Sequence, residues 1–208
     1  MIWDADRGAS SSQQQKPGGR LCLLFLRRNL LKGEILPKIA RASISSCFGL
    51  DYPEPECPDE FLADGATFVT LTKQGLLRGC IGSLEARRPI PIDIRQNALM
   101  AAFRDPRFPP LIEAECASIK IAVSLLSDSE PIVFSNEKEA ILALRPGMDG
   151  VILECDSKRS TFLPQVWESL PEPETFLGEL KLKAGLPRRF WSEKIRLSRY
   201  TVSKWLES

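Results

Sequence analysis

The chain has 208 residues, of which 43% are hydrophobic and 26% are charged, and its formal net charge is +1. This is the composition of a globular domain with a sizeable core, and it excludes a disordered or fibrous protein. Residues 1–33 carry a net charge of +4, which leaves −3 on residues 34–208. A slightly acidic body argues against broad binding to nucleic-acid backbones, which needs a concentrated cationic surface.

Residues 1–33 are predicted to be a disordered or appended N-terminal extension. The stretch GASSSQQQKPGG is polar and low in complexity, so it cannot bury a core. The apolar run Leu21–Leu26 is interrupted by two arginines and is far shorter than the roughly 20 apolar residues of a membrane span. It also lacks the apolar core and cleavage site of a secretory signal. The sequence therefore predicts a cytoplasmic protein with no membrane association.

From Glu34 onward the pattern predicts an α+β domain with antiparallel sheets. A helix is expected over 35–48, then a proline-rich loop over 51–61 and a hairpin over 66–84 that turns at 73–75. Further elements are expected in this order: a helix over 91–103, a strand over 118–127, a short helix from 136 that stops at Pro146, a hairpin over 150–164, a helix over 173–187 and a strand over 195–206. Hairpins and separate helices without β-α-β alternation favour antiparallel sheets.

The six cysteines show no CxxC spacing, and the chain contains no histidine. Zinc sites usually need such ligand pairs, so no metal and no cofactor is predicted; a structural zinc held by scattered cysteines stays the alternative. In a chain this long, the cysteines are interpreted as reduced thiols rather than as a disulfide framework. Cys47 and Cys155 are expected to be buried, and Cys57 is expected to be exposed in its proline-rich loop.

The segment LLRGCIGSLEARRP, 76–89, places Cys80 between two glycines with Arg78 two residues before it. A thiol reacts as its thiolate, which a nearby cation favours, and Arg78 would lie on the same face of a strand. Gly79 and Gly82 would allow a ligand or another backbone to approach closely. The opposing interpretation is a small buried strand cysteine, because a cysteine nucleophile usually needs a histidine base. The residues alone leave both interpretations open.

Two further segments carry polar side chains that suggest binding. The loop FRDPRFPP holds Arg104, Asp105 and Arg107, whose guanidinium groups could bind a carboxylate or phosphate, or could instead form a local network with the aspartate. Asp149 stands between glycines just before a strand. An acid at that position could face a cleft, or could form a turn by bonding its own backbone.

The C-terminal third contains two other candidates. Thr161 and Gln165 flank a proline, and the neighbouring Trp167 could form the floor of a cleft or belong to the core. The stretch 181–199 is basic and contains two aromatic residues, which could be a nucleic-acid patch or a solvated helix face.

Together, six segments resemble the AMME-syndrome chromosomal-region protein family, called AmmeMemoRadiSam system protein A in prokaryotes. They are LRGCIG at 77–82, AAFRDPRFPPL at 101–111, LRPGMDGVIL at 144–153, TFLPQVW at 161–167, KAGLP at 183–187 and RYTV at 199–202. LRGCIG matches the family's signature without change, and all six segments fall in the expected order. The resemblance covers about 34–202 and leaves 1–33 outside it.

The resemblance implies an α+β fold of two unequal lobes, each an antiparallel sheet with helices. Both ends of the domain, 34–208, would belong to the larger lobe, and the LRGCIG side chains would face a cleft between the lobes. That cleft would be wide enough for a large substrate, either a protein or a nucleic acid. The family's biochemical activity is unassigned, and its prokaryotic name implies association with a radical-SAM enzyme and a Memo-like protein.

Two functional hypotheses follow. In the first, the protein is a cysteine-dependent enzyme or enzyme component of such a modification system, with Cys80 as nucleophile and Arg78 stabilising its thiolate. The substrate-binding candidates are then Gly79, Gly82, Arg104, Asp105, Arg107, Asp149, Thr161 and Gln165. In the second hypothesis the protein is a non-catalytic adaptor that grips a peptide or partner protein, and Cys80 is only small and apolar.

Overall fold

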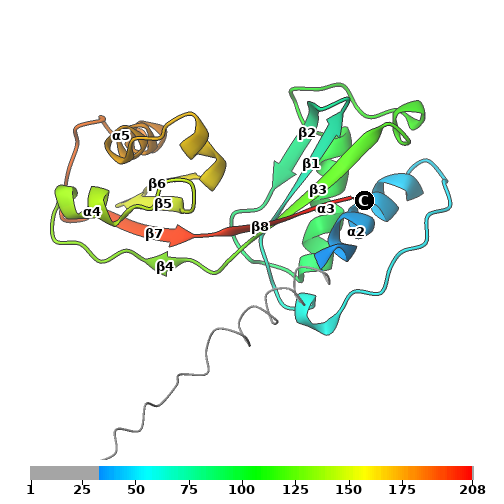
Figure 1. Cartoon of the computed structure of the whole chain (residues 1–208), viewed down its shortest axis with the longest axis horizontal. Coiled ribbons are helices and arrows are strands. Elements are labelled where there is room, and N and C mark those ends of the chain that lie inside the picture. Colours follow the sequence, from blue (N-terminus) through cyan, green and yellow to red (C-terminus); the bar gives the residue numbers. More distant parts are fainter. Residues whose placement is uncertain (1–32, 208) are drawn as a thin grey trace, which may run out of the picture. The chain divides into compact units, whose positions relative to one another are not determined.

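The computed structural model describes residues 33–207, and the residues from Glu34 onward belong to one compact unit. They form an α+β structure with two antiparallel sheets of four strands each (Figure 1), so the predicted fold class is confirmed. Apart from Gly33, the predicted N-terminal extension over 1–33 lies outside the described residues.

The first sheet has the strand order β2-β1-β3-β8. Its strands are β1 (Thr67–Lys73), β2 (Leu76–Gly82), β3 (Ile119–Leu126) and β8 (Val202–Leu206). Between β1 and β2, Gln74 and Gly75 have φ angles of 52° and 80°. Two consecutive positive φ angles are typical of the tight turns whose twist matches an antiparallel pair. The hairpin and turn expected from the sequence are therefore confirmed.

Helices α2 (Ile35–Ser46) and α3 (Ile90–Phe103) pack on one face of this sheet. Val69 and Leu71 of β1 are buried in the same core as residues of both helices. That core includes Leu36, Ile39, Ile44, Ile94, Ala98, Ile121, Val123 and Trp205. Because side chains alternate along a strand, Phe68 and Thr70 point to the opposite face, and neither belongs to this core.

The second sheet has the strand order β4-β7-β5-β6. Its strands are β4 (Glu130–Pro131), β5 (Gly150–Cys155), β6 (Lys158–Phe162) and β7 (Arg196–Tyr200), and its helices are α4 (Glu137–Ala143) and α5 (Pro173–Lys183). Its core is separate from the first and includes Trp167 and Phe176, whose rings stack with centroids 3.7 Å apart. Two short 3-10 helices, η2 (Glu113–Glu115) and η3 (Pro164–Glu168), lie in the connections after α3 and β6.

The strand expected over 195–206 is divided between the two sheets. β7 and β8 are separated only by Thr201, and each pairs in a different sheet (Figure 1). Beside this crossing, the Ser127 N–H donates to the Thr201 carbonyl at 2.9 Å, so the connection from β3 to β4 runs next to that from β7 to β8. The division into two unequal lobes with a cleft between them stays a prediction.

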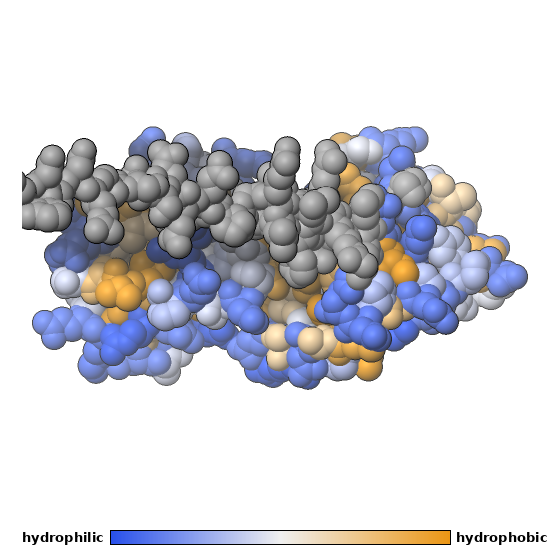
Figure 2. All heavy atoms as spheres, turned by 60° about the horizontal axis from the view of Figure 1, so that its bottom comes forward, coloured by the Kyte–Doolittle hydropathy of each residue, from blue (hydrophilic) through white to orange (hydrophobic). Residues whose placement is uncertain are grey.

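In the described part of the chain, no helix combines the length and the apolar character that a membrane crossing demands. Figure 2 shows apolar residues on one side of the molecule as separate patches among hydrophilic ones.

Candidate functional site

Cys80 lies on β2, an edge strand of the first sheet. The register pairs Cys80 with Thr70, and the Cys80 Sγ lies 3.3 Å from the Thr70 Oγ1. Both side chains therefore lie on the face opposite the helices. The same alternation and register add Phe68, Ser124 and Lys204 to this surface, which we call the Cys80 face. The Cys80 side chain is half-buried there.

Asp105 and Arg107 bind the main chain of Cys80. The Cys80 N–H donates to the Asp105 Oδ2 at 2.8 Å, and the Arg107 Nη2 donates to the Cys80 carbonyl at 3.0 Å. These are the peptide groups that point away from β1, so the two side chains occupy the hydrogen-bonding positions of a missing neighbour strand. The loop thus closes the outer edge of β2 at Cys80.

The charges of this pair neutralise each other. Arg107 donates through Nε to the Asp105 Oδ1 at 2.9 Å and through Nη2 to Oδ2 at 2.7 Å. The Arg107 guanidinium holds the pKa of the buried Asp105 carboxyl well below its usual range. The same hydrogen bond raises the pKa of Arg107, with a smaller contribution from Cys80. Arg104, the third candidate of this loop, is exposed and forms no ion pair with another described residue.

Arg78 does not share the face of Cys80, and this part of the prediction is wrong. The register of β1 and β2 shifts by one residue between Leu71 and Thr72, which is a β-bulge that interrupts the alternation at Arg78. The buried Arg78 instead binds Glu115 on η2, with 2.8 Å between Nη2 and Oε2, and Lys73 binds the same carboxylate at 2.9 Å. These two cations lower the pKa of Glu115 to about 2.

Both glycines of the signature are explained by packing within the protein. A Cβ at Gly79 would overlap the backbone carbonyl of Ala101 in α3, and a Cβ at Gly82 would overlap the ring of Phe68. Gly79 therefore admits a helix backbone and Gly82 admits an aromatic side chain. The sequence predicted the close approach of a ligand or another backbone at both positions. A backbone lies close to Gly79, as predicted, whereas an aromatic side chain lies close to Gly82.

Asp149 and Thr161 have structural partners in the second half of the chain. Asp149 is fully buried, and its carboxylate accepts from the Arg145 N–H at 3.0 Å and the Arg145 Nε at 2.8 Å. Its carbonyl accepts from the Trp167 indole at 2.7 Å. The Thr161 hydroxyl lies 3.0 Å from that of Tyr200. In the described structure neither makes a hydrogen bond to β2 or to the loop that carries Asp105.

Gln165, the last candidate, is exposed on η3. It lines a hollow of about 450 Å³ together with Trp167 and with Lys204 of the Cys80 face. The hollow thus contains one predicted site residue and one end of the Cys80 face, but not Cys80 itself.

The other thiols differ partly from expectation. Cys155 is buried as predicted, but Cys47 is exposed because it follows the last turn of α2, where the chain leaves the core. Cys57 is half-buried rather than exposed, and it packs against the first core. Burial raises the pKa of the Cys57 thiol.

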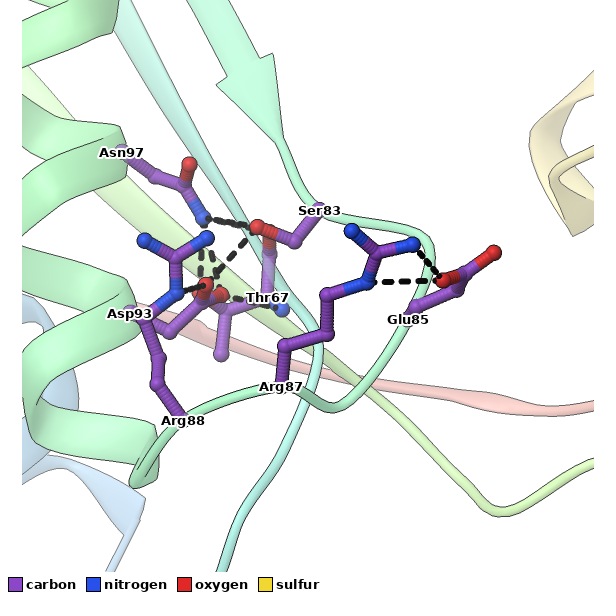
Figure 3. A network of polar contacts seen from close by, with 7 residues as sticks. All are labelled: Thr67, Ser83, Glu85, Arg87, Arg88, Asp93 and Asn97. Carbon is purple, nitrogen blue, oxygen red and sulfur yellow. Dashed lines mark hydrogen bonds and ion pairs between the residues drawn. The ribbon is translucent and has the colours of Figure 1, made fainter.

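A buried carboxylate that the sequence reasoning did not single out is Asp93 on α3 (Figure 3). Its Oδ2 accepts from the N–H and hydroxyl of Thr67 at 2.9 and 2.7 Å and from Asn97 at 2.8 Å. Its Oδ1 accepts from Ser83 at 2.7 Å and lies 3.0 Å from the Arg88 Nε. The sequence feature that could have indicated this cluster is the spacing of Asp93 and Asn97, an acid and an amide four residues apart among the apolar positions of a helix.

Comparison with known proteins adds the family. The model of the AMMECR1 family matches residues 37–205. The chain belongs to this family. A protein of Methanothermobacter thermautotrophicus is 36% identical over 179 residues, covering 81% of this chain and 91% of the relative. One from Thermotoga maritima is 37% identical over 156 residues, covering 74% of this chain and 84% of the relative.

A crystal structure of an uncharacterized protein from Pyrococcus horikoshii has a TM-score of 0.70 and 31% identity, covering 83% of this chain and 90% of that one. The AMMECR1 assignment therefore accounts for the fold of nearly all described residues. It leaves the biochemical activity unassigned, so the role of the Cys80 face has to be argued from its own chemistry.

Proposed function

We propose that this AMMECR1-family protein is a non-catalytic binding component that holds a partner protein on the Cys80 face. The observation that carries the proposal is that the charged side chains around Cys80 bond to one another and to the backbone. Asp105 and Arg107 bond each other and the Cys80 peptide group, and Arg78 bonds Glu115. These side chains hold the strand in position, and among the described residues no carboxylate or amine forms a hydrogen bond with the thiol.

A cysteine enzyme needs a group that removes the thiol proton. The hydroxyl of Thr70, which lies 3.3 Å from the thiol, has no such capacity near neutral pH. Asp105 is close to Cys80, but a carboxylate whose pKa lies well below its usual range is a weak base. Arg107 supplies a cation, yet its charge is shared with Asp105 at 2.7 Å. These features weaken the enzyme hypothesis.

The composition of the Cys80 face favours a protein as partner. One cross-strand row runs through Cys80, Thr70, Ala122 and Leu206, and none of these four side chains is charged. Leu206 at the end of this row is 66% exposed. Ala122 is buried, so Cys80, Thr70 and Leu206 form the accessible part of the row. Surfaces with few charges at their centre are typical of protein interfaces.

A nucleic acid would need free cations, and the basic stretch 181–199 offers few. Four of its side chains are in ion pairs: Lys181 with Glu137, Arg188 with Glu179, Lys194 with Asp156 and Arg199 with Asp149. The first partners to test are a radical-SAM enzyme and a Memo-like protein. Their choice rests on the resemblance of the sequence to the family.

The experiment compares two arginine substitutions of the full chain, each tagged and purified from the native host. Thr70→Arg places a long charged side chain on the Cys80 face, while Ile92→Arg places one on α3, where Ile92 is 49% exposed in the opposite layer. Quantitative mass spectrometry measures the co-purified proteins, and thermal melting confirms that both variants fold. We expect Thr70→Arg to lose at least one partner about tenfold, as a buried unpaired charge costs more than 1.4 kcal/mol. Equal retention by both variants would contradict the proposal.

A further inference from the structure

No strand of the described residues, 33–207, pairs with the outer edge of β8. The Glu207 N–H donates to the Ile121 carbonyl at 2.9 Å, which fixes the hydrogen-bonding phase between β3 and β8. In an antiparallel pair, alternate residues direct their peptide groups toward and away from the partner strand. Val202, Lys204 and Leu206 therefore direct their N–H and C=O groups away from β3. No described residue pairs with these groups.

The second sheet explains why this edge is vacant. β7 continues into β8 after Thr201, and β5 lies along β7 with Gly150 opposite Tyr200. Before Gly150 the chain turns at Gly147, whose φ is 75°, instead of continuing beside β8. The partner strand on this side thus stops where β8 begins. A polypeptide laid along β8 would occupy the position that β5 leaves.

A hollow of about 450 Å³ adjoins this edge. Val202 and Lys204 of β8 line it, and so do Pro146, Pro164, Trp167 and Pro171; the exposed Glu168 also belongs to its lining. Proline has no N–H, so these three residues offer no backbone donor that would compete with β8 for an incoming strand. The rings and the indole give an apolar wall for the side chains of an added strand, as in other strand-addition sites.

Charge indicates which strand would fit. Lys204 is exposed at the middle of the β8 edge and forms no ion pair with another described residue. A carboxylate on the added strand would complement its ammonium group, whereas a second copy of this chain would bring another Lys204 to the same edge. Because Glu168 also lines the hollow, this complementarity concerns the position beside Lys204, and it favours an extended segment of a different protein that carries an acidic residue there.

We infer that the outer edge of β8 takes up an extended segment of a partner protein as an added strand, with an acidic residue beside Lys204 and with side chains that enter the hollow beside Trp167. The inference rests on the proposed binding function, since it gives the way in which a partner is held. It goes beyond that function because the recognised groups are the backbone of β8 and Lys204 rather than Cys80.

The test uses a displayed library of random twelve-residue peptides, selected on the full chain. Enriched peptides are synthesised and titrated against wild type, Lys204→Ala and Lys204→Pro. Both substitutions remove the charge, but only proline removes the outward N–H, and proline is tolerated at outward positions of edge strands. We expect enriched peptides to share an Asp or Glu, to lose about threefold in affinity with Lys204→Ala and about a further tenfold with Lys204→Pro.

A second measurement does not depend on the folding of the proline variant. Amide exchange of the wild-type chain is followed by NMR with and without an enriched peptide. The Lys204 and Leu206 amides should become protected on binding, while the Ser203 amide, which already faces β3, should not change. Equal affinity for the alanine and proline variants, or no new protection, would overturn the inference. A library that yields no binding peptide would also overturn it. If Lys204→Ala then self-associates, the role of Lys204 is to prevent two copies of the chain from pairing through this edge.

Failure here is separable from failure of the proposed function. If Thr70→Arg loses the native partner while Lys204→Pro retains it, the Cys80 face binds the partner and strand addition at β8 is wrong.

Discussion

Asp105 and Arg107 form hydrogen bonds with the N–H and the C=O of Cys80 at the outer edge of β2. Polar side chains often cover the unpaired backbone groups of an edge strand in this way. Asp105 is buried, yet both of its oxygens accept hydrogen bonds, from Cys80 on one side and Arg107 on the other. A buried carboxylate with this many donors stabilises a fold only while every bond is kept. The pair therefore makes the LRGCIG strand sensitive to small changes in the loop.

The first prediction concerns this carboxylate. Asp105→Asn replaces one acceptor by an N–H group that faces donors, so we expect a loss of about 3 kcal/mol in the free energy of unfolding. Urea denaturation measures it. Asp128→Asn is the matched control, because Asp128 is exposed, and it should change stability by less than about 0.5 kcal/mol. Similar losses in the two variants would show that the Asp105 bonds contribute little.

The second prediction is a pH dependence that comes from Glu115. Arg78 and Lys73 lower its folded pKa to about 2, whereas an unfolded glutamate has a pKa of about 4.3. A depressed folded pKa contributes stability that is fully present above about pH 4.3 and is lost as pH falls toward 2. The contribution is at most about 3 kcal/mol, at 1.36 kcal/mol per pKa unit.

Unfolding free energies at pH 5, 4 and 3 test this dependence. Glu115→Gln should lose less stability over this interval than wild type, because its amide does not titrate. The control is Glu56→Gln, an exposed residue that forms no ion pair with another described residue, and it should follow wild type. If Glu115→Gln also follows wild type, the Arg78–Glu115 pair does not set the acid stability.

The sequence predicted Cys80, Asp105 and Arg107 as site residues, and the structure brings the three together. The partner of Arg78 could not be predicted from the sequence. Strand alternation suggested the face of Cys80, but the bulge reverses it, and Glu115 lies 37 residues along the chain. The position of a bulge depends on the register with the neighbouring strand, and the residues around Arg78 alone do not predict that register.

At the scale of elements, the helices and hairpins followed from periodicity and turn residues. The prediction of one strand over 195–206 was wrong in one respect, because the chain passes from one sheet to the other at Thr201. Its residues continue the same alternation through that point, and the change depends on which strands lie beside it. The two-residue β4 was missed because it is short and contains a proline.

The third prediction compares glycines within elements. Gly79→Ala would push against the α3 backbone at Ala101, which cannot rotate away, so we expect a loss of more than about 3 kcal/mol. Gly82→Ala meets the ring of Phe68, which is half-buried and can move, and about 1–2 kcal/mol is expected. A Cβ at Gly178 in α5 would lie 3.8 Å from Arg188, its nearest neighbour beyond the adjoining turns of the helix, so Gly178→Ala should stabilise by about 0.5–1 kcal/mol. Thermal and urea melts would give the order, and a reversed order of Gly79 and Gly82 would contradict the packing described.

At the scale of the whole molecule, two sheets with separate cores are joined by neighbouring chain crossings at Ser127 and Thr201. In this arrangement α2 and α3 lie on the face opposite the Cys80 face, and the edge of β8 that pairs with no described strand lies beside the start of the second sheet. No local pattern of residues predicts this arrangement, because the placement of one sheet against another depends on contacts between residues far apart in the chain. The resemblance implied two lobes, and the crossings are compatible with that prediction.

The central claim is that the Cys80 face binds a partner and that the thiol performs no reaction. The most direct measurement replaces wild type by Cys80→Ser in the native host and quantifies both the co-purified partners and growth. Serine keeps the size and the contact with Thr70 but is a far weaker nucleophile. We predict partner recovery within about twofold of wild type, as expected for a near-isosteric change at a binding surface, and unchanged growth. Retained partners together with the growth defect of a complete deletion would contradict the account and assign chemistry to Cys80.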